Sequence, residues 1–228
     1  MAEETIFYRR NLPHIQPPNG LFFITFRLTD SLPKHVVQEL KESRRKEIET
    51  LEKTLTPEKF ESRKYRLEKR YFAEFDRWLD TCTEGPQWLK DERVAQIVAN
   101  KIHDFDNKRY HLIAYCIMSN HVHLVIEQTG VERISESNIK GKTKSYLLAD
   151  TLRLLKGGTS RLSNIELGRG GTFWHHESYD HYVRDEEELG RIVEYVLNNP
   201  VKAGLVEAWQ DWEFTYWVQI ATGEHQLS

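Results

Sequence analysis

The sequence predicts an α+β fold: an antiparallel sheet with helices on its faces and an inserted, charged helical hairpin. Short runs of aromatic and β-branched residues, typical of buried strands, occur between segments whose apolar residues recur at helical spacing. The chain has 228 residues, a natural length for one domain with an insertion or for two small domains. We expect one domain over 1–228, with the insertion at about 34–81 and a C-terminal tail after about 205.

The composition excludes several classes of protein. The formal net charge is −3, so a site for phosphates would have to be a local basic patch rather than a global basic field. Cys82 and Cys116 are the only cysteines, which argues for a reducing compartment and against a disulfide scaffold or a cysteine-rich zinc site. No apolar run approaches the length of a membrane span, and the N-terminus lacks the apolar core of a signal peptide. We expect a cytoplasmic protein with no membrane partner.

The first expected elements are an arm, a strand and the helical insertion. Residues 1–20 contain several prolines and should form an irregular arm, while residues 21–29 read as a buried strand. The insertion is rich in Lys, Arg and Glu, and Thr56-Pro57 is typical of the start of its second helix. Its mixed charges indicate a solvated face. The alternative is that basic side chains of the second helix line a nucleic-acid groove: Arg63, Lys64, Arg66, Lys69 and Arg70.

The next elements complete most of a sandwich. Asp91 can cap a helix that ends near Asp106-Asn107, and strands are expected at 110–118 and 121–127 around a tight turn. A strand, a crossover helix and a hairpin form the first three quarters of a ferredoxin-like sandwich. The fourth strand should lie within 173–183.

Two further helices are expected between and after these strands. A polar and mobile segment at 129–144 leads into a basic helix at about 145–156, which Gly157-Gly158 should end. A second helix should begin at Asp185, where Glu188 makes a capping-box-like pair, and should stop before Pro200.

The strand at 121–127 carries the first candidate site residues. His121 and His123 are two positions apart, so their imidazoles point to the same face of the strand. Two converging imidazoles can share one divalent ion. The alternative is a pair of strand histidines near a polar surface.

The helix that begins at Asp185 carries the second part of the candidate site. Tyr195 and Asn199 are four residues apart and should lie on one face, one turn from each other. A tyrosine hydroxyl can attack a phosphodiester and retain the cut strand as a phosphotyrosine. The histidines and the amide oxygen would then hold Mg²⁺ or Mn²⁺ on the phosphate. The alternative is that Tyr195 only packs at the helix edge and that the asparagine ends the helix.

Three sequence blocks, taken together, resemble the REP-associated tyrosine transposases. These are bacterial relatives of the single-tyrosine HUH transposases that mobilise small insertion sequences. The resemblance covers roughly residues 8–30 and 88–217. Its blocks are Tyr115 to Val125, Phe173-Trp174 running into Tyr179 to Glu188, and Tyr195 to Val206.

The resemblance implies a ferredoxin-like or RRM-like HUH domain with a divalent metal. His121 and His123 fall on the family's metal-binding pair, Tyr195 on the nucleophile and Asn199 on the third ligand. Many insertion-sequence relatives have glutamine at the last position. Because asparagine is shorter, either the helix sits nearer the sheet or a water intervenes.

The resemblance also implies a substrate, namely single-stranded DNA from palindromic repeats folded as hairpins. Binding it requires phosphate contacts and stacking platforms. The insertion-sequence relatives act as dimers and the REP-associated ones as monomers, so either state is open here. The candidate DNA contacts are Arg9 and Arg10 in the arm, Arg153 and Lys156 in the basic helix, and Trp174 or Tyr179.

Three functions are consistent with these residues. The first is a metal-dependent single-strand DNA endonuclease and strand transferase that acts through a 5′-phosphotyrosine at Tyr195. The second is a regulator on the same fold that binds single-stranded or hairpin DNA without cutting it. The third, a histidine-based phosphohydrolase, would need another histidine where the chain has Val125.

Overall fold

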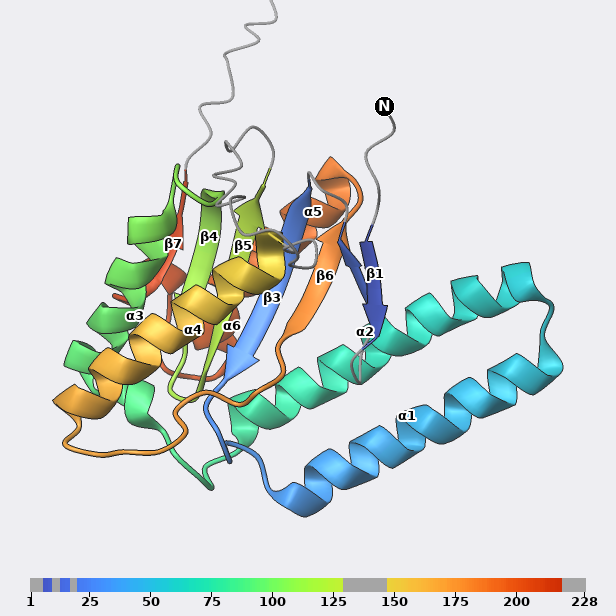
Figure 1. The fold of residues 1–228 in the computed structure, drawn as a ribbon, viewed down its shortest axis with the longest axis horizontal. Coiled ribbons are helices and arrows are strands. Elements are labelled where there is room, and N and C mark those ends of the chain that lie inside the picture. Colours follow the sequence, from blue (N-terminus) through green and yellow to red (C-terminus); the bar gives the residue numbers. More distant parts are fainter. Residues whose placement is uncertain (1–5, 10–12, 17–19, 129–146, 219–228) are drawn as a thin grey trace, which may run out of the picture.

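The computed structural model describes residues 6–9, 13–16, 20–128 and 147–218. Its centre is a five-stranded sheet in which every neighbouring pair is antiparallel (Figure 1). The order β6-β3-β5-β4 of the first four strands is that of a ferredoxin-like sandwich, which confirms the expected fold class. The strands, in sheet order, are β6 (Tyr179–Val183), β3 (Leu21–Arg27), β5 (His121–Glu127), β4 (His111–Ile117) and β7 (Thr215–Trp217).

Helices cover both faces of this sheet. One face packs against α3 (Glu92–Phe105) and α4 (Leu147–Glu166), which lie in front of the strands in Figure 1. The opposite face packs against α5 (Glu186–Leu197), which is followed by the short helix α6 (Asn199–Lys202). Because side chains alternate along β5, Val122, Leu124 and Ile126 enter the first layer, whereas the two histidines face the α5 side with Val125.

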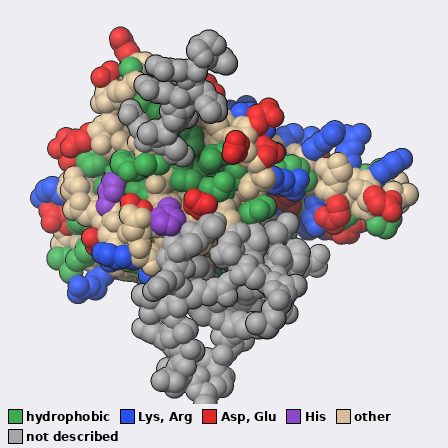
Figure 2. Space-filling model, turned by 90° about the horizontal axis from the view of Figure 1, so that it is seen from above, with side chains coloured by type: hydrophobic (Ala, Val, Ile, Leu, Met, Phe, Trp, Pro, Cys, Tyr) green, Lys and Arg blue, Asp and Glu red, His purple; other side chains and the backbone are tan. Residues whose placement is uncertain are grey.

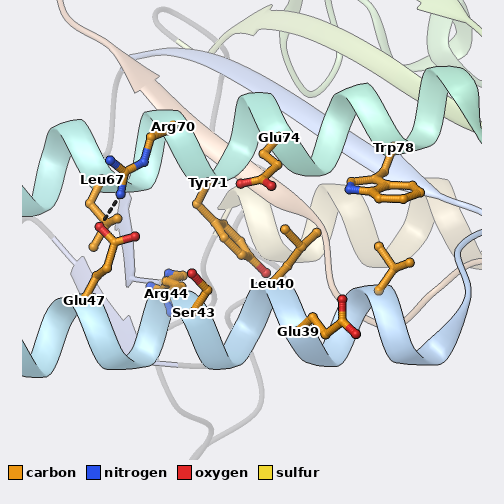
Figure 3. A pocket seen from close by; sticks show the side chains of 11 residues that line it. Glu39, Leu40, Ser43, Arg44, Glu47, Leu67, Arg70, Tyr71, Glu74 and Trp78 are labelled. Carbon is orange, nitrogen blue, oxygen red and sulfur yellow. Dashed lines mark hydrogen bonds and ion pairs between the residues drawn. The ribbon is translucent and has the colours of Figure 1, made fainter.

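The expected helical insertion is present. Helix α1 (Lys34–Thr54) and helix α2 (Pro57–Thr81) form a long hairpin that extends beyond the sheet (Figure 1). The two helices enclose a pocket lined by residues such as Leu40, Tyr71 and Trp78 (Figure 3). The projecting end of the hairpin carries both basic and acidic side chains on the face drawn in Figure 2. This mixture fits the expected solvated face.

The middle of α2 is docked onto the domain. The buried carboxylate of Glu188 in α5 accepts hydrogen bonds from Tyr65 and Lys69 of α2 and from the Arg184 backbone. Burial alone would raise the pKa of Glu188, but Lys69, the Arg184 backbone N–H and His181 lower it to about 2. Glu188 is therefore ionised, and its carboxylate links α2 of the insertion to α5.

Two local expectations were wrong. Part of the irregular arm forms two paired strands, β1 (Ile6–Arg9) and β2 (Pro13–Gln16). Helix α4 continues through Gly157-Gly158 because its buried face, which includes Leu155 and Thr159, outweighs the roughly 1 kcal/mol cost of each glycine. Helix α5 stops before Pro200, as expected, and Pro200 lies in the first turn of the separate helix α6. The C-terminal tail contributes β7 to the sheet.

Two short 3-10 helices complete the described elements: Trp88–Lys90 and Trp209–Asp211. The predicted polar segment 129–144 lies outside the described residues. Within the part of the chain that is described, no helix is long and apolar enough to cross a membrane.

Candidate metal centre and tyrosine site

The two histidines of β5 lie side by side beneath the α5 layer. Both side chains are fully buried, and their Nε2 atoms are 3.1 Å apart. The register of the sheet places His123 between Thr25 of β3 and Cys116 of β4, in the middle of the sheet. The predicted convergence of the two imidazoles is therefore present.

Hydrogen bonds at the other ring nitrogen hold each imidazole in place. The Asn120 side-chain nitrogen donates to the Leu79 carbonyl oxygen at 3.0 Å, so its oxygen faces His121 Nδ1, 2.7 Å away, as an acceptor. His121 thus carries its proton on Nδ1 and leaves the Nε2 lone pair unprotonated. His123 Nδ1 is 2.8 Å from the Thr25 hydroxyl. Such outer partners are typical of metal-binding histidines.

Burial keeps both imidazoles neutral. It lowers the pKa of His121 to about 3, and it lowers the pKa of His123 well below its usual value, with further contributions from His121 and Lys202. A neutral imidazole is the form that binds a metal ion. The chemistry of the pair therefore suits a divalent cation.

Asn199 and Tyr195 reach the same histidines from the helical layer. Asn199 is fully buried, and its side-chain nitrogen lies 3.2 Å from His123 Nε2, so no water needs to intervene. The Asn199 oxygen has no hydrogen-bond partner among the described residues. The Tyr195 ring packs edge-on against the His123 ring, with centroids 5.5 Å apart. The ammonium of Lys202 lies over the Tyr195 ring, 4.5 Å from its centroid.

Tyr195 and Asn199 do not share one uninterrupted helix. Helix α5 ends at Leu197, and Asn199 is the first residue of α6. Asn199 is fully buried in the cluster, whereas Tyr195 is half-buried. The four predicted residues meet, with Tyr195 and Asn199 on two successive helices instead of one.

Two aspartates of α2 complete this cluster. Asp76 Oδ1 is 3.5 Å from His123 Nε2, and Asp80 Oδ1 is 3.6 Å from His121 Nε2. Neither contact is an ion pair, because both imidazoles are neutral. Asp76 is almost completely buried, and burial together with Asp80 raises its pKa well above the usual value. Burial also raises the pKa of Asp80, to about 7.

The donor atoms fit a metal ion in spacing and in chemistry. Ligand atoms of Asp76, His121 and His123 all lie within 4.8 Å of one another. Ligands about 2.1 Å from one ion at tetrahedral or octahedral angles stand roughly 3.0–3.4 Å apart, close to the 3.1–3.5 Å separations within the cluster. Neither oxygen of Asp76 has a hydrogen-bond partner within the described ranges. These unpaired oxygens and lone pairs are what a bound cation would satisfy.

Sequence reasoning missed both aspartates, although α2 carries a signal for one of them. Asp76 occupies the apolar stripe that runs through Phe72 and Leu79, at a spacing that normally selects a hydrophobic side chain. A carboxylate at such a position needs a partner. The partner itself, on β5, lies too far along the chain for a local pattern to reveal.

The two aromatic DNA-contact candidates are engaged inside the protein. Trp174 is buried and donates from Nε1 to the Thr159 hydroxyl at 2.8 Å, while its ring packs on Phe26. Tyr179 stacks on Phe72 of α2 with centroids 3.9 Å apart. In this conformation Trp174 is enclosed in the core, and Phe72 covers one face of the Tyr179 ring.

The basic candidates are placed in different ways. Arg153 is exposed on α4, with Asp150 3.6 Å away. The Lys156 ammonium donates to the carbonyl oxygens of His175 and His176 and so fastens the segment before β6. Arg9 lies in β1, and Arg10 falls outside the described residues.

The fold and the site together define a ferredoxin-like α+β domain that gathers imidazole, amide, carboxylate and tyrosine groups on one face of its sheet. A curated protein of Haemophilus influenzae, provisionally named a REP-associated tyrosine transposase, is 26% identical over 106 residues. This match covers 46% of the chain and 58% of the relative, so it spans less than two thirds of that protein. It confirms the resemblance indicated by the sequence blocks.

A solved structure of a REP-associated tyrosine transposase bound to a REP hairpin is also similar. It is 15% identical, the alignment covers 94% of this chain and 82% of that chain, and the TM-score is 0.48. No protein-family model matches the sequence. The fold assignment rests on the strand order itself.

Proposed function

We propose that the protein is a metal-dependent single-strand DNA endonuclease and strand transferase. Its substrate would be hairpin-flanked repeat DNA, and its nucleophile Tyr195. The observation that carries this proposal is the packing of the Tyr195 ring on His123, beside a buried cluster of potential metal ligands. The resemblance to REP-associated tyrosine transposases supports the choice of DNA as substrate.

Tyr195 would act as a covalent nucleophile. Its phenolic oxygen attacks the phosphorus, the bond from phosphorus to the 3′ oxygen breaks, and the released strand takes up a proton as a 3′ hydroxyl. The phenolic proton leaves to solvent. Lys202, whose ammonium lies over the same ring, places a positive charge where negative charge develops. In strand transfer, a 3′ hydroxyl attacks the phosphotyrosine and restores the free tyrosine.

His121, His123 and Asn199 would hold the ion, Mg²⁺ or Mn²⁺. A half-turn of the Asn199 amide exchanges its nitrogen and its oxygen, and brings the unpaired oxygen to the position now 3.2 Å from His123 Nε2. When bound, a divalent ion neutralises charge on the phosphate and orients it for in-line attack.

Contacts to the DNA would come from basic residues of the chain. The proposed phosphate contacts remain Arg153 on α4 together with Arg9 and Arg10 in the N-terminal segment. The two aromatic candidates, Trp174 and Tyr179, would have to leave their present packing to stack on a base. The protein would act in the cytoplasm as a monomer or a homodimer. The alternative function is a regulator that binds the hairpin without cutting it.

The test is formation of a covalent adduct. Protein incubated with single-stranded hairpin DNA and Mn²⁺ should yield a DNA-linked band on a denaturing gel. Tyr195→Phe should bind the hairpin as the wild type does but form no adduct. Tyr182→Phe is the matched control, because that ring packs on Phe22 on the opposite face of the sheet, and it should leave the adduct unchanged. An adduct with Tyr195→Phe refutes the assignment, and binding without any cleavage by the wild type favours the regulator.

A further inference from the structure

We propose that the inserted hairpin is part of the metal centre, with Asp76 of α2 as a direct ligand of the ion held by His121 and His123. Asp80 would stand beside it as the second carboxylate. The proposal extends the metal site of the proposed function and rests on it. It assigns a role to the insertion, which the sequence resemblance leaves outside its matched blocks.

Burial makes Asp76 unlike an ordinary surface carboxylate. Its side chain is about 1% exposed, and neither of its oxygens accepts a hydrogen bond from any described residue. Removing an unpaired carboxylate from water is costly unless a cation or a set of donors replaces the water. The side chain nevertheless lies where the Nε2 atoms of the two imidazoles also converge.

The neighbouring protein groups do not supply that partner. His123 is the nearest ring, with Nε2 3.5 Å from Asp76 Oδ1, but neither Asp76 oxygen accepts a hydrogen bond from it. The side chain of Lys202 is exposed and also makes no hydrogen bond to the Asp76 oxygens. A divalent cation between the carboxylate and the two Nε2 atoms would satisfy all three groups.

The charge balance favours carboxylate ligation. His121, His123 and Asn199 are neutral ligands, so an ion held by these three alone would bring two uncompensated charges into a fully buried site. Asp76 and Asp80, whose oxygens lie 3.5 Å and 3.6 Å from the ring nitrogens, would supply two negative charges once a bound cation favours their ionised forms. A mixed set of imidazole and carboxylate ligands suits Mn²⁺ and Mg²⁺ better than a soft metal.

The position of α2 does not depend on the ion alone. Glu188 holds the helix through Lys69 and Tyr65, and the Leu79 carbonyl accepts a hydrogen bond from Asn120, next to His121. The helix is thus placed so that Asp76 faces the histidines before any metal arrives. An ion would then fasten α2 to the sheet and make the insertion more rigid.

The test measures metal binding and does not depend on DNA cleavage. Full-length protein stripped with a chelator is titrated with Mn²⁺ by calorimetry. The wild type should bind one ion, and Asp76→Asn should weaken binding at least about tenfold. Glu74→Gln is the matched control, since this carboxylate lies two residues away on α2 but faces the pocket between α1 and α2, and it should bind as the wild type does (Figure 3). His123→Asn should also lose binding.

A second measurement, made on the wild type, tests the inference even if a variant fails to fold. In the wild type, Mn²⁺ should slow hydrogen exchange of the α2 amides around Asp76, as well as those of β5. Unchanged Mn²⁺ affinity in Asp76→Asn, or metal binding that leaves α2 exchange unaltered, overturns the inference. If His123→Asn alone loses binding, the proposed metal site stands without Asp76. If the wild type binds no Mn²⁺, both the inference and the metal dependence of the proposed function are wrong.

Discussion

Replacing Asp80 by asparagine should stabilise the metal-free protein at high pH. The Asp80 carboxyl is largely buried, with 16% of its side chain exposed, and burial raises its pKa from 3.8 to about 7. Because the folded-state pKa lies above the unfolded one, stability is lost as the pH rises from about 4 to about 7. Asparagine has nearly the same shape and never carries the charge.

The expected magnitude follows from the pKa difference. A shift of about 3.2 units, from 3.8 to about 7, corresponds to roughly 4 kcal/mol at about 1.36 kcal/mol per unit. Asp80→Asn should therefore gain up to about 4 kcal/mol at pH 8, but only about 2 kcal/mol at pH 5, where much of the Asp80 charge in the folded state is already neutralised. For a chain of this length, the gain at pH 8 corresponds to a Tm increase of roughly 10 °C.

Urea and thermal unfolding in the presence of a chelator would measure the gain at both pH values. Glu74→Gln is the control, because Glu74 is exposed on the same helix and should change stability little at either pH. A variant that is no more stable than the wild type at pH 8, or one whose gain is the same at both pH values, would refute the reasoning from buried charge. Added Mn²⁺ should reduce the advantage of the variant, since the ion neutralises the carboxylate.

Two further predictions concern the ring partner of His123 and the length of α4. Thr25→Val removes the hydroxyl that lies 2.8 Å from His123 Nδ1 and should weaken Mn²⁺ binding, measured by calorimetry, about 10- to 100-fold. Circular dichroism should show that the fold is kept. Unchanged Mn²⁺ affinity would contradict a role of Thr25 in orienting the His123 ring. Gly157→Ala should raise the free energy of unfolding by about 1 kcal/mol, because the position is helical and an added Cβ meets nothing within 4 Å. A loss of stability in urea unfolding would show that the helix does not continue through this position.

Local sequence signals determined most of the secondary structure. Alternation of side chains placed both histidines on one face of β5, and the strand has the predicted bounds, His121–Glu127. Capping also operated as expected, since the Asp185 side chain accepts the Glu188 backbone N–H at 2.7 Å at the start of α5. These features depend on neighbours within a few residues, so the sequence alone contains them.

Where long-range packing competes with a local rule, the sequence was a poor guide. Two glycines predict a helix end, but the burial of Leu155 and Thr159 carries α4 past them. Trp174 looked available for stacking, yet its indole nitrogen finds the Thr159 hydroxyl in the core. In both cases the deciding contact comes from tertiary burial, which a single-sequence pattern does not encode.

The residues of the candidate site also differ in whether the sequence alone could predict them. The sequence by itself indicated His121, His123, Tyr195 and Asn199, because their spacings and residue types suggest a shared ion and a nucleophile. Only the tertiary structure brought Asp76 to 3.5 Å from His123, through a helix that begins and ends far from β5 in the chain. The role of a buried carboxylate depends on the groups that face it, and for Asp76 these groups are determined by how α2 docks on the sheet.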